Sequence, residues 1–242
     1  MSASLVLCYH AVSSSWEHRL SIPAPTLERQ LRLLLLRRFR PARASDVVAG
    51  RGRLLHVTFD DAYRSVANVL PALERLGVPA TVFACSGVAG RPLAIPELAA
   101  EAASRPRELE TMDWDELAGL AERDVEIGSH TVSHPHLPRL SDAELRRELV
   151  DSRAEIEDRL TRPCRFLAYP FGDEDARVRR AAEAAGYEAA FALPGNESRL
   201  DRYALPRVGV YPRDGTVRLT LKTTASLRRS AAALARATGS RR

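Results

Sequence analysis

The sequence lacks several features that would assign it to whole classes of protein. Its 242 residues include only three cysteines, which lie far apart, so neither a disulfide framework nor a cysteine-based zinc site is expected. No apolar run approaches the roughly 18 residues that span a bilayer, since the stretch 31–36 is short and contains Arg32. The first residues also lack the cationic region of a secretory signal, and we therefore expect a cytoplasmic protein.

Lysine and aromatic side chains are scarce as well. Lys222 is the only lysine, and a genome rich in G and C is the simplest reason for so much arginine. The net charge of +5 would suit an anionic partner, but it is diffuse along most of the chain and aromatic residues make up only 6%. No nucleic-acid partner is therefore expected. The basic end, residues 216–242, is predicted to be a packed helix and tail, with contact to an anionic membrane as the open alternative.

What the sequence does contain is an alternation of short apolar runs with segments of helical period, which is typical of a parallel β/α architecture. We expect one catalytic domain over residues 1–215, with helices over 26–38, 63–76, 113 onward, 141–160 and 175–185. The seven predicted strands are 5–9, 54–59, 80–84, 125–128, 165–169, 189–192 and 207–210. Periodicity alone leaves a closed barrel and an open sheet as alternatives. The turn-rich stretch 86–106 is predicted to be a long loop that borders a site.

Two adjacent carboxylates, Asp60 and Asp61, follow the predicted strand 54–59 directly. At the end of a buried strand, such groups repel each other and lose hydration unless a cation or a proton lies between them. The carboxyl ends of strands are also where α/β folds bind their ligands. A pair of helix N-cap residues is the structural alternative, but the position favours a metal site.

His130 and His134 follow another predicted strand and converge on one ion if their segment makes a helical turn. A histidine pair on a surface helix is the alternative. One carboxylate and two imidazoles would leave coordination positions open for water or substrate, as a catalytic metal site requires. If Asp61 binds the ion, Asp60 can take a proton from the activated water. His136 is placed outside the ligand set because Pro135 breaks the spacing.

A third unit, residues 166–173, is a predicted strand that runs into a Pro-Phe-Gly turn. The backbone N–H groups of this turn are candidates for stabilising an oxyanion, and its approach to a ligand makes Tyr169 and Pro170 candidate substrate contacts. Trp114 precedes a predicted helix and is a candidate for stacking on a sugar face. A plain strand-to-helix connection is the alternative for this turn, and core packing is the alternative for Trp114.

Taken together, the segments 58–61, 129–134 and 169–172 resemble the three successive motifs of the polysaccharide deacetylases, carbohydrate esterase family four. The resemblance covers about residues 5–210 and implies a distorted (β/α) barrel of about seven parallel strands. It also implies metal-dependent hydrolysis of an N-acetyl group on an amino sugar. By this resemblance Asp60 is the general base, Phe171 lends its backbone N–H to the oxyanion, and the metal ligands are Asp61, His130 and His134.

The sequence departs from the family pattern in two places. Many members carry an arginine in the third motif that pairs with the base, where this chain has Ala168, and we predict that Arg207 supplies the missing cation. The late histidine that serves as general acid is also missing, since none follows His136. The segment 5–12 is similar to the amino-terminal motif of the branch with the biofilm poly-N-acetylglucosamine deacetylases, in which the acid lies on the first strand. His10 is therefore the predicted acid, with a histidine capping a core strand as the alternative.

These features predict a monomeric, divalent-metal-dependent deacetylase that acts on a polysaccharide, an oligosaccharide or a glycoside. Zinc fits the mixed oxygen and nitrogen ligands, and so would cobalt, nickel or iron. Hydrolysis of another C–N bond, in a small acetylated or cyclic-amide metabolite, is the first alternative. A catalytically silent carbohydrate-binding or nucleic-acid-binding protein is the second, against which the complete set of candidate residues argues. Substrate choice depends on the shape of loops such as 86–106, which sequence does not reveal.

Overall fold

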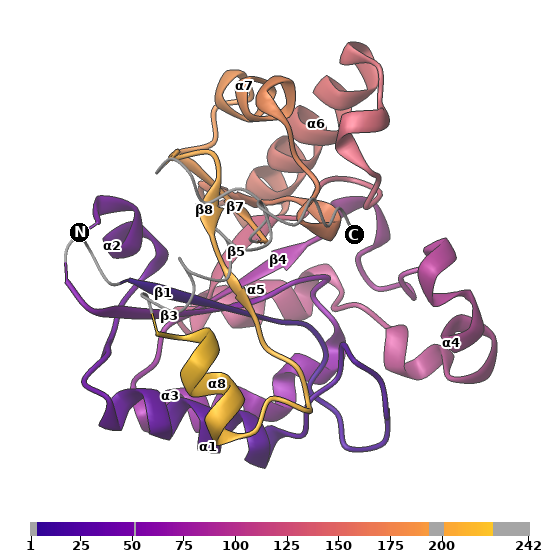
Figure 1. Cartoon of the computed structure of the whole chain (residues 1–242). Coiled ribbons are helices and arrows are strands. Elements are labelled where there is room, and N and C mark those ends of the chain that lie inside the picture. Colours follow the sequence, from indigo (N-terminus) through magenta and orange to yellow (C-terminus); the bar gives the residue numbers. More distant parts are fainter. Residues whose placement is uncertain (1–3, 51, 194–200, 225–242) are drawn as a thin grey trace, which may run out of the picture.

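The computed structural model describes residues 4–50, 52–193 and 201–224. Their strands form one parallel sheet in the order β8-β7-β6-β5-β4-β3-β1-β9, with β2 paired to β3 beside this path. The strands are β1 Leu5–Tyr9, β2 Arg40–Pro41, β3 Leu54–Phe59, β4 Ala80–Ala84, β5 Glu126–Ser129, β6 Phe166–Ala168, β7 Ala189–Ala192, β8 Leu205–Pro206 and β9 Val208–Gly209. Because β8 pairs with β7 while β9 pairs with β1, this last segment joins the two edges of the sheet. The nearly closed barrel confirms the predicted (β/α) fold (Figure 1).

Helices connect the strands and cover the outside of the sheet (Figure 1). The α-helices are α1 Ala24–Leu36, α2 Ala44–Ala49, α3 Leu70–Leu76, α4 Ala99–Ser104, α5 Trp114–Glu122, α6 Asp142–Leu160, α7 Ala176–Ala184 and α8 Thr216–Lys222. Six short 3₁₀ helices are η1 Arg64–Val69, η2 Ser86–Val88, η3 Pro96–Leu98, η4 Pro106–Leu109, η5 Leu137–Arg139 and η6 Pro170–Gly172. Along α1 the buried residues Leu27, Leu31 and Leu34 recur at helical spacing, which is how such a helix holds to the sheet.

The structure departs from the predicted elements at a few boundaries. The predicted helix 63–76 is divided into η1 and α3, because Pro71 lacks the N–H that a continuous helix would need and is tolerated only in a first turn. A proline is likewise tolerated in the first turn of α1, so this helix starts at Ala24 and includes Pro25 instead of starting at Thr26. The stretch 86–106, predicted as a loop, contains η2, η3 and α4, while α2 and the short strands β2 and β8 were not predicted.

Side chains that alternate along the strands form two apolar clusters. Leu5, Leu7 and Tyr9 of β1 face outward and join the large cluster beneath the helices. A second cluster contains inward-facing residues, among them Val6 of β1 and Phe83 of β4, and fills the lower part of the barrel. The same inward-facing positions continue toward the carboxyl ends of the strands as Cys8, His10, Thr58 and Asp60, so the two-residue period of the strands brings polar groups into the mouth of the barrel.

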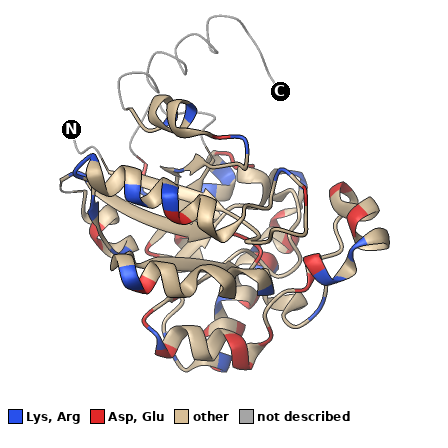
Figure 2. Cartoon of the chain, turned by 90° about the horizontal axis from the view of Figure 1, so that it is seen from below, with Lys and Arg blue, Asp and Glu red and all other residues tan. Residues whose placement is uncertain are grey.

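Charges of both signs are interspersed over the outer helices instead of gathering on one face (Figure 2). The helix α8 lies against α1, where Nη1 of Arg37 donates to Oγ1 of Thr223 at 2.6 Å. Residues 225–242, the rest of the predicted basic tail, lie outside the described residues. Among the helices of the described ranges, none combines the length and the apolar character that crossing a bilayer requires.

Candidate active site

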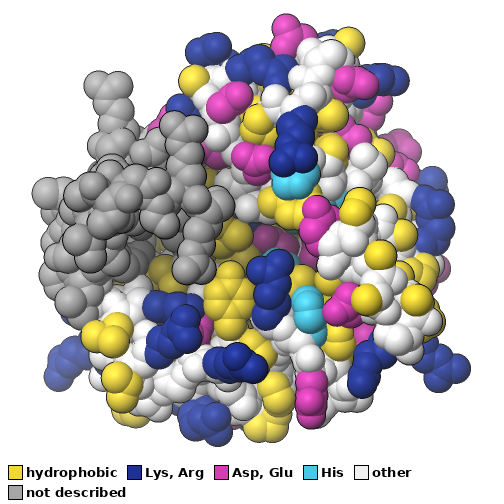
Figure 3. Space-filling view, turned by 45° about the vertical axis from the view of Figure 1, so that its right-hand side comes forward, with side chains coloured by type: hydrophobic (Ala, Val, Ile, Leu, Met, Phe, Trp, Pro, Cys, Tyr) yellow, Lys and Arg dark blue, Asp and Glu magenta, His cyan; other side chains and the backbone are white. Residues whose placement is uncertain are grey.

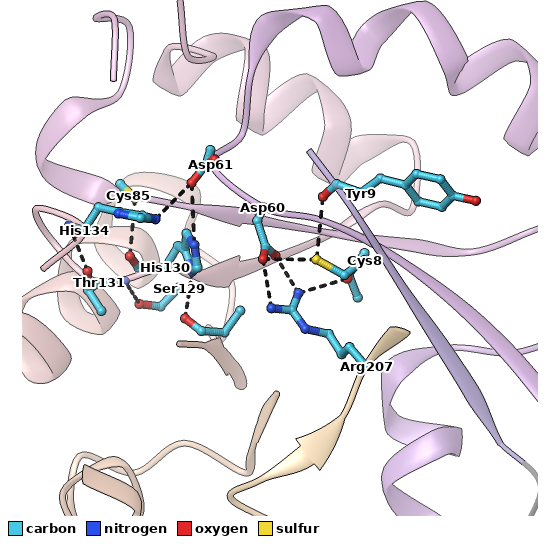
Figure 4. A network of polar contacts seen from close by, with 12 residues as sticks. Cys8, Tyr9, Asp60, Asp61, Cys85, Ser129, His130, Thr131, His134 and Arg207 are labelled. Carbon is cyan, nitrogen blue, oxygen red and sulfur yellow. Dashed lines mark hydrogen bonds and ion pairs between the residues drawn. The ribbon is translucent and has the colours of Figure 1, made fainter. Parts of the chain in front are cut away.

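Asp61, His130 and His134 come together at the carboxyl ends of β3 and β5, as Figure 4 shows. Nε2 of His130 lies 3.5 Å from Oδ1 of Asp61, and Nε2 of His134 lies 3.3 Å from the same oxygen. All three side chains are buried. Nδ1 of His130 donates to the backbone oxygen of Ala168 at 2.7 Å, which leaves the Nε2 lone pair directed at Asp61. Burial lowers the pKa of His130 to about 4, so this imidazole is neutral near pH 7.

This cluster fits a divalent ion. Oδ1 of Asp61 is buried and has no hydrogen-bond partner within the described chain, although two imidazole nitrogens face it. One potential ligand atom from each residue lies within 4.8 Å of the other two. A carboxylate oxygen and two neutral imidazole nitrogens form a donor set that zinc and its neighbours in the first transition row accept. Three protein ligands would leave at least one position for a water or a substrate oxygen.

Asp60 points away from this cluster, toward Arg207 (Figure 4). Nη1 and Nη2 of Arg207 donate to the two carboxylate oxygens at 2.5 and 2.8 Å, and Nη1 also donates to Oγ1 of Thr58 at 3.0 Å. The guanidinium is fully buried, and Asp60 is 2% exposed. Burial by itself would raise the pKa of Asp60, but the charge and hydrogen bonds of Arg207, together with the nearby histidines, outweigh it and hold the pKa of this carboxyl well below its usual range. Asp60 is therefore an ionised carboxylate, the form that can accept a proton.

His10 directly follows β1 and lies close to Asp60. One side-chain ligand atom from each of Cys8, His10 and Asp60 lies within 4.8 Å of the other two. The Cys8 thiol donates to Oδ2 of Asp60 at 3.3 Å, and burial keeps it protonated by raising its pKa. A protonated thiol and a carboxylate already neutralised by Arg207 are poor ligands, so we do not regard this cluster as a second metal site.

The backbone of the loops that carry these residues is strained. Eight non-glycine residues of the described ranges have positive φ, and five of them belong to this site: Asp61 (φ 68°), Ala62 (50°), Thr131 (71°), His134 (61°) and Phe171 (59°). Each such conformation is unfavourable by about 1–2 kcal/mol for an L-residue. Residues are held there only where the surrounding contacts outweigh the strain, and such positions gather at functional sites.

The Pro-Phe-Gly turn lies beside the histidines. The Phe171 ring meets His134 edge-on at a centroid distance of 4.6 Å and stacks on His136 at 4.0 Å. Nδ1 of His136 in turn lies 3.0 Å from Oδ2 of Asp173. Gly172 has a φ of 69°, and a Cβ there would come within 2.5 Å of the Leu193 side chain, so the turn requires glycine. The Phe171 backbone is thus fixed next to the proposed metal ligands, while the use of its N–H remains a prediction.

The three side chains that were predicted to contact substrate make packing contacts in the structure. Tyr169 is fully buried and donates its hydroxyl to the backbone oxygen of Tyr203 at 2.8 Å, and Pro170 is buried beside it. Trp114 packs on the core, with the Arg159 guanidinium 5.7 Å from its ring centroid. Within the described residues, none of the three makes a polar or ring contact with the aspartates or histidines. Their part in substrate binding remains a prediction, and the structure assigns each a clear packing role.

Two further side chains contact the site, although the sequence did not predict them as site residues. Cys8 was not among the candidate site residues, although its place two residues before His10 puts both on the same face of β1. Glu148 of α6 accepts hydrogen bonds from the loop between His130 and His134. No local signal marks Glu148, because the helix brings it back to this loop only in the folded barrel.

The site lies near the surface of one face of the molecule. The space-filling view shows a hollow with acidic and hydrophobic side chains inside it and histidine and basic side chains at its margin (Figure 3). The metal-binding candidates and Asp60 are each less than a tenth exposed, whereas His10 and Phe171 are only half-buried. The proposed acid and oxyanion donor are thus more exposed to solvent than the metal-binding candidates and Asp60.

Comparison with known proteins gives consistent results. Residues 48–190 match the family model described as polysaccharide deacetylase. The Bacillus subtilis (strain 168) protein YxkH, whose name places it with the polysaccharide deacetylases, is 25% identical over 217 residues, which are 86% of this chain and 71% of YxkH. Two solved structures share the fold. IcaB from Ammonifex degensii has a TM-score of 0.75 and 22% identity over 93% of this chain and 98% of its own. The Streptococcus pyogenes deacetylase PplD, in complex with acetate, has a TM-score of 0.74 and 17% identity over 91% and 97%. The chain belongs to the polysaccharide deacetylase family, whose members are hydrolases of carbon–nitrogen bonds.

Proposed function

We propose that this protein removes the acetyl group from an N-acetylated amino sugar and releases acetate. The observation that carries the proposal is the division of two adjacent carboxylates between two partners. Asp61 faces His130 and His134 as a potential metal ligand, while Asp60 is held ionised by Arg207. A base kept next to a metal site, yet not itself a ligand, is what hydrolysis by an activated water requires.

Asp61, His130 and His134 would hold the ion, which we propose to be zinc, with cobalt, nickel or iron as substitutes. When bound there, a divalent ion polarises the acetyl carbonyl and makes water a better nucleophile. Asp60 takes the proton from the attacking water, because Arg207 keeps this carboxyl ionised. The Arg207 guanidinium cannot itself act as base, since it remains protonated at all relevant pH.

His10 is the proposed general acid. Breaking the C–N bond requires a proton on the departing nitrogen, and the half-buried imidazole of His10, just after β1 and close to Asp60, can deliver one. The Phe171 N–H is the proposed donor to the oxyanion of the tetrahedral intermediate. Because the turn is fixed by Gly172 and by the rings of His134 and His136, this donor does not have to be reorganised during the reaction.

Acetate release from a panel of N-acetyl glycosides of increasing length tests the proposal. We expect activity that is lost on chelation, regained with added Zn²⁺ or Co²⁺, and absent in Asp61→Asn. The matched control is Asp151→Asn, which changes an exposed carboxylate of α6 outside the site and should retain metal-dependent activity. Activity indifferent to chelators would overturn the metal-dependent mechanism. Release from small acetylated metabolites or cyclic amides, with none from amino sugars, would favour the other C–N hydrolase function.

A further inference from the structure

The loop between the two histidine ligands is held in an unfavourable conformation. Thr131 has a φ of 71° and His134 a φ of 61°. A β-branched residue such as threonine rarely adopts positive φ, so this loop would relax if its surroundings allowed it. Relaxation would move the His134 backbone, and with it the imidazole that faces Asp61 at 3.3 Å. The geometry of the metal cluster therefore depends on whatever holds this loop.

The carboxylate of Glu148, on α6, holds this loop through hydrogen bonds. Its Oε2 accepts hydrogen bonds from the backbone N–H groups of Val132 and Ser133 at 2.8 and 2.9 Å. Its Oε1 accepts a hydrogen bond from the Ser133 hydroxyl at 2.6 Å. Hydrogen bonds to a charged acceptor are about twice as strong as those between neutral groups. One carboxylate from α6 thus secures both residues that lie at the centre of the loop.

The remaining contacts of the loop explain why this restraint matters. Within the loop, Oγ1 of Thr131 accepts from the His134 N–H at 3.1 Å, a bond that forms only while the turn is closed. On its other side, the N–H groups of Ser86 and Gly87 donate to the backbone oxygens of Thr131 and Val132 at 3.1 and 3.0 Å. These bonds satisfy the carbonyl oxygens, whereas Glu148 satisfies the N–H groups of the same turn. Without Glu148, the N–H of half-buried Val132 would lose its partner, and the N–H and hydroxyl of the more exposed Ser133 would be left to solvent.

We propose that Glu148 is a positioning residue that keeps His134 in its metal-binding orientation, so that it sets the metal affinity of the site. This inference rests on the proposed function, since it assumes an ion held by Asp61, His130 and His134. Groups that orient metal ligands typically change metal affinity by about 10–100-fold when they are removed. Glu148 acts through the loop and touches neither the ion nor the reacting atoms.

The test measures metal affinity directly, with Co²⁺ alone as a spectroscopic probe and with Zn²⁺ in competition with a chelator. Glu148→Ala should weaken binding by about 10–100-fold. Glu148→Gln should bind almost as tightly as wild type, because one amide oxygen can accept both backbone N–H groups. Asp151→Ala is the matched control, as it removes an exposed carboxylate from the same helix and should leave affinity unchanged. Glu148→Asp, with the carboxylate withdrawn by one methylene, replaces the alanine variant if that one does not fold.

Activity gives the second readout. At saturating metal, Glu148→Ala should recover most of its kcat, because the lost function is retention of the ion rather than chemistry. Equal Co²⁺ affinity in Glu148→Ala and wild type would overturn the inference, and so would a loss in Glu148→Gln as large as that in the alanine variant. If wild type and Asp61→Asn bound Co²⁺ equally, the proposed metal site itself would fail, independently of Glu148.

Discussion

Replacing Arg207 with methionine should move the acid limb of the pH–activity profile to higher pH. Arg207 contacts both oxygens of Asp60 in a fully buried ion pair. Opposite charges about 4 Å apart attract by roughly 4 kcal/mol at an effective dielectric constant of about 20. Since one pKa unit corresponds to about 1.4 kcal/mol, removal of the cation should raise the pKa of Asp60 by at most about 3 units. A bound metal ion would retain part of the effect, so we expect a shift of about 1–3 units.

The direction of this pH shift follows from the protonation state in which Asp60 is active. The base works only when ionised, and in wild type Arg207 holds the pKa of this carboxyl well below its usual range. We therefore expect the activity of the wild type to persist in acid. In Arg207→Met the pKa rises, so the base becomes protonated, and activity declines, at a higher pH than in wild type.

The assay is kcat/KM for acetate release across the pH range in which the protein stays folded, at saturating metal. Arg207→Lys keeps the charge but loses the two-pronged geometry and should shift the limb less. Arg213→Met removes an exposed arginine and should shift nothing. An acid limb of a folded Arg207→Met protein that superimposes on the wild-type limb would refute the reasoning that Asp60 is the base controlled by Arg207.

The same substitution should also destabilise the fold, because it leaves the Asp60 carboxylate buried and unpaired. Removing one partner of a buried ion pair typically lowers the free energy of unfolding by about 3–5 kcal/mol. Urea unfolding of Arg207→Met, Asp60→Asn and the double variant measures this. We expect the double variant to lose less than the sum of the single losses, since neither charge is then left alone. Additive losses would show that the two side chains do not stabilise each other.

His10→Gln should strongly lower kcat for glycosides with a poor amine leaving group and should change metal affinity little, because His10 donates a proton and holds no ion. Equal kcat in the variant and in wild type would exclude His10 as the acid. His56 gives a prediction about stability. Its Nδ1 donates to the Ala42 backbone oxygen at 2.9 Å, its Nε2 lies 2.9 Å from Oγ1 of Thr81, and burial lowers its pKa to about 4. Between the ordinary pKa of about 6.5 and pH 4, the unfolded chain takes up a proton that the folded chain does not, so stability falls as pH falls. At pH 4.5 the loss should be about 2.4 kcal/mol relative to pH 7, and urea unfolding of His56→Gln should lack this part of the pH dependence; identical pH dependences would contradict it.

The sequence predicted the parts of the fold that are set by local pattern. The strands 5–9, 54–59, 80–84 and 189–192 appear with the bounds that the apolar runs indicated, because each run is buried on both faces between barrel interior and helices. Pattern did not resolve the strand at 207–210. Leu205–Pro206 pairs on one side and Val208–Gly209 on the other, so Arg207 sits in the seam of the barrel, an outcome of chain closure that no local signal carries.

The candidate site shows the same division between local and tertiary information. Asp60, Asp61, His130 and His134 stand at strand ends, where spacing in sequence translates directly into proximity in a parallel sheet. Whether a side chain beyond a strand end is exposed to solvent depends on tertiary packing and cannot be predicted from the local sequence. Tyr169 was a candidate substrate contact, yet its ring is buried and its hydroxyl bonds to Tyr203, 34 residues along the chain. Glu148 lies on α6, and it reaches the loop between the two histidines only because α6 packs against β5.

The left-handed turn at Asp61 and Ala62 explains how two adjacent aspartates serve two purposes. In a regular strand, neighbouring side chains point to opposite faces, and a residue directed outward from β3 would enter the layer of apolar side chains under the helices. The positive φ values of 68° and 50° instead turn the chain so that Asp61 remains at the mouth of the barrel, facing the histidines, while Asp60 stays on the inner face against Arg207. Two residues at positive φ are unfavourable by about 2–4 kcal/mol. Two carboxylates directed to one point about 4 Å apart would repel each other by roughly 4 kcal/mol, before any loss of hydration is counted. The strain of the turn is therefore comparable to the repulsion between two convergent carboxylates, and the turn directs Asp61 to the histidines while Asp60 faces Arg207, as the proposed roles of ligand and base require.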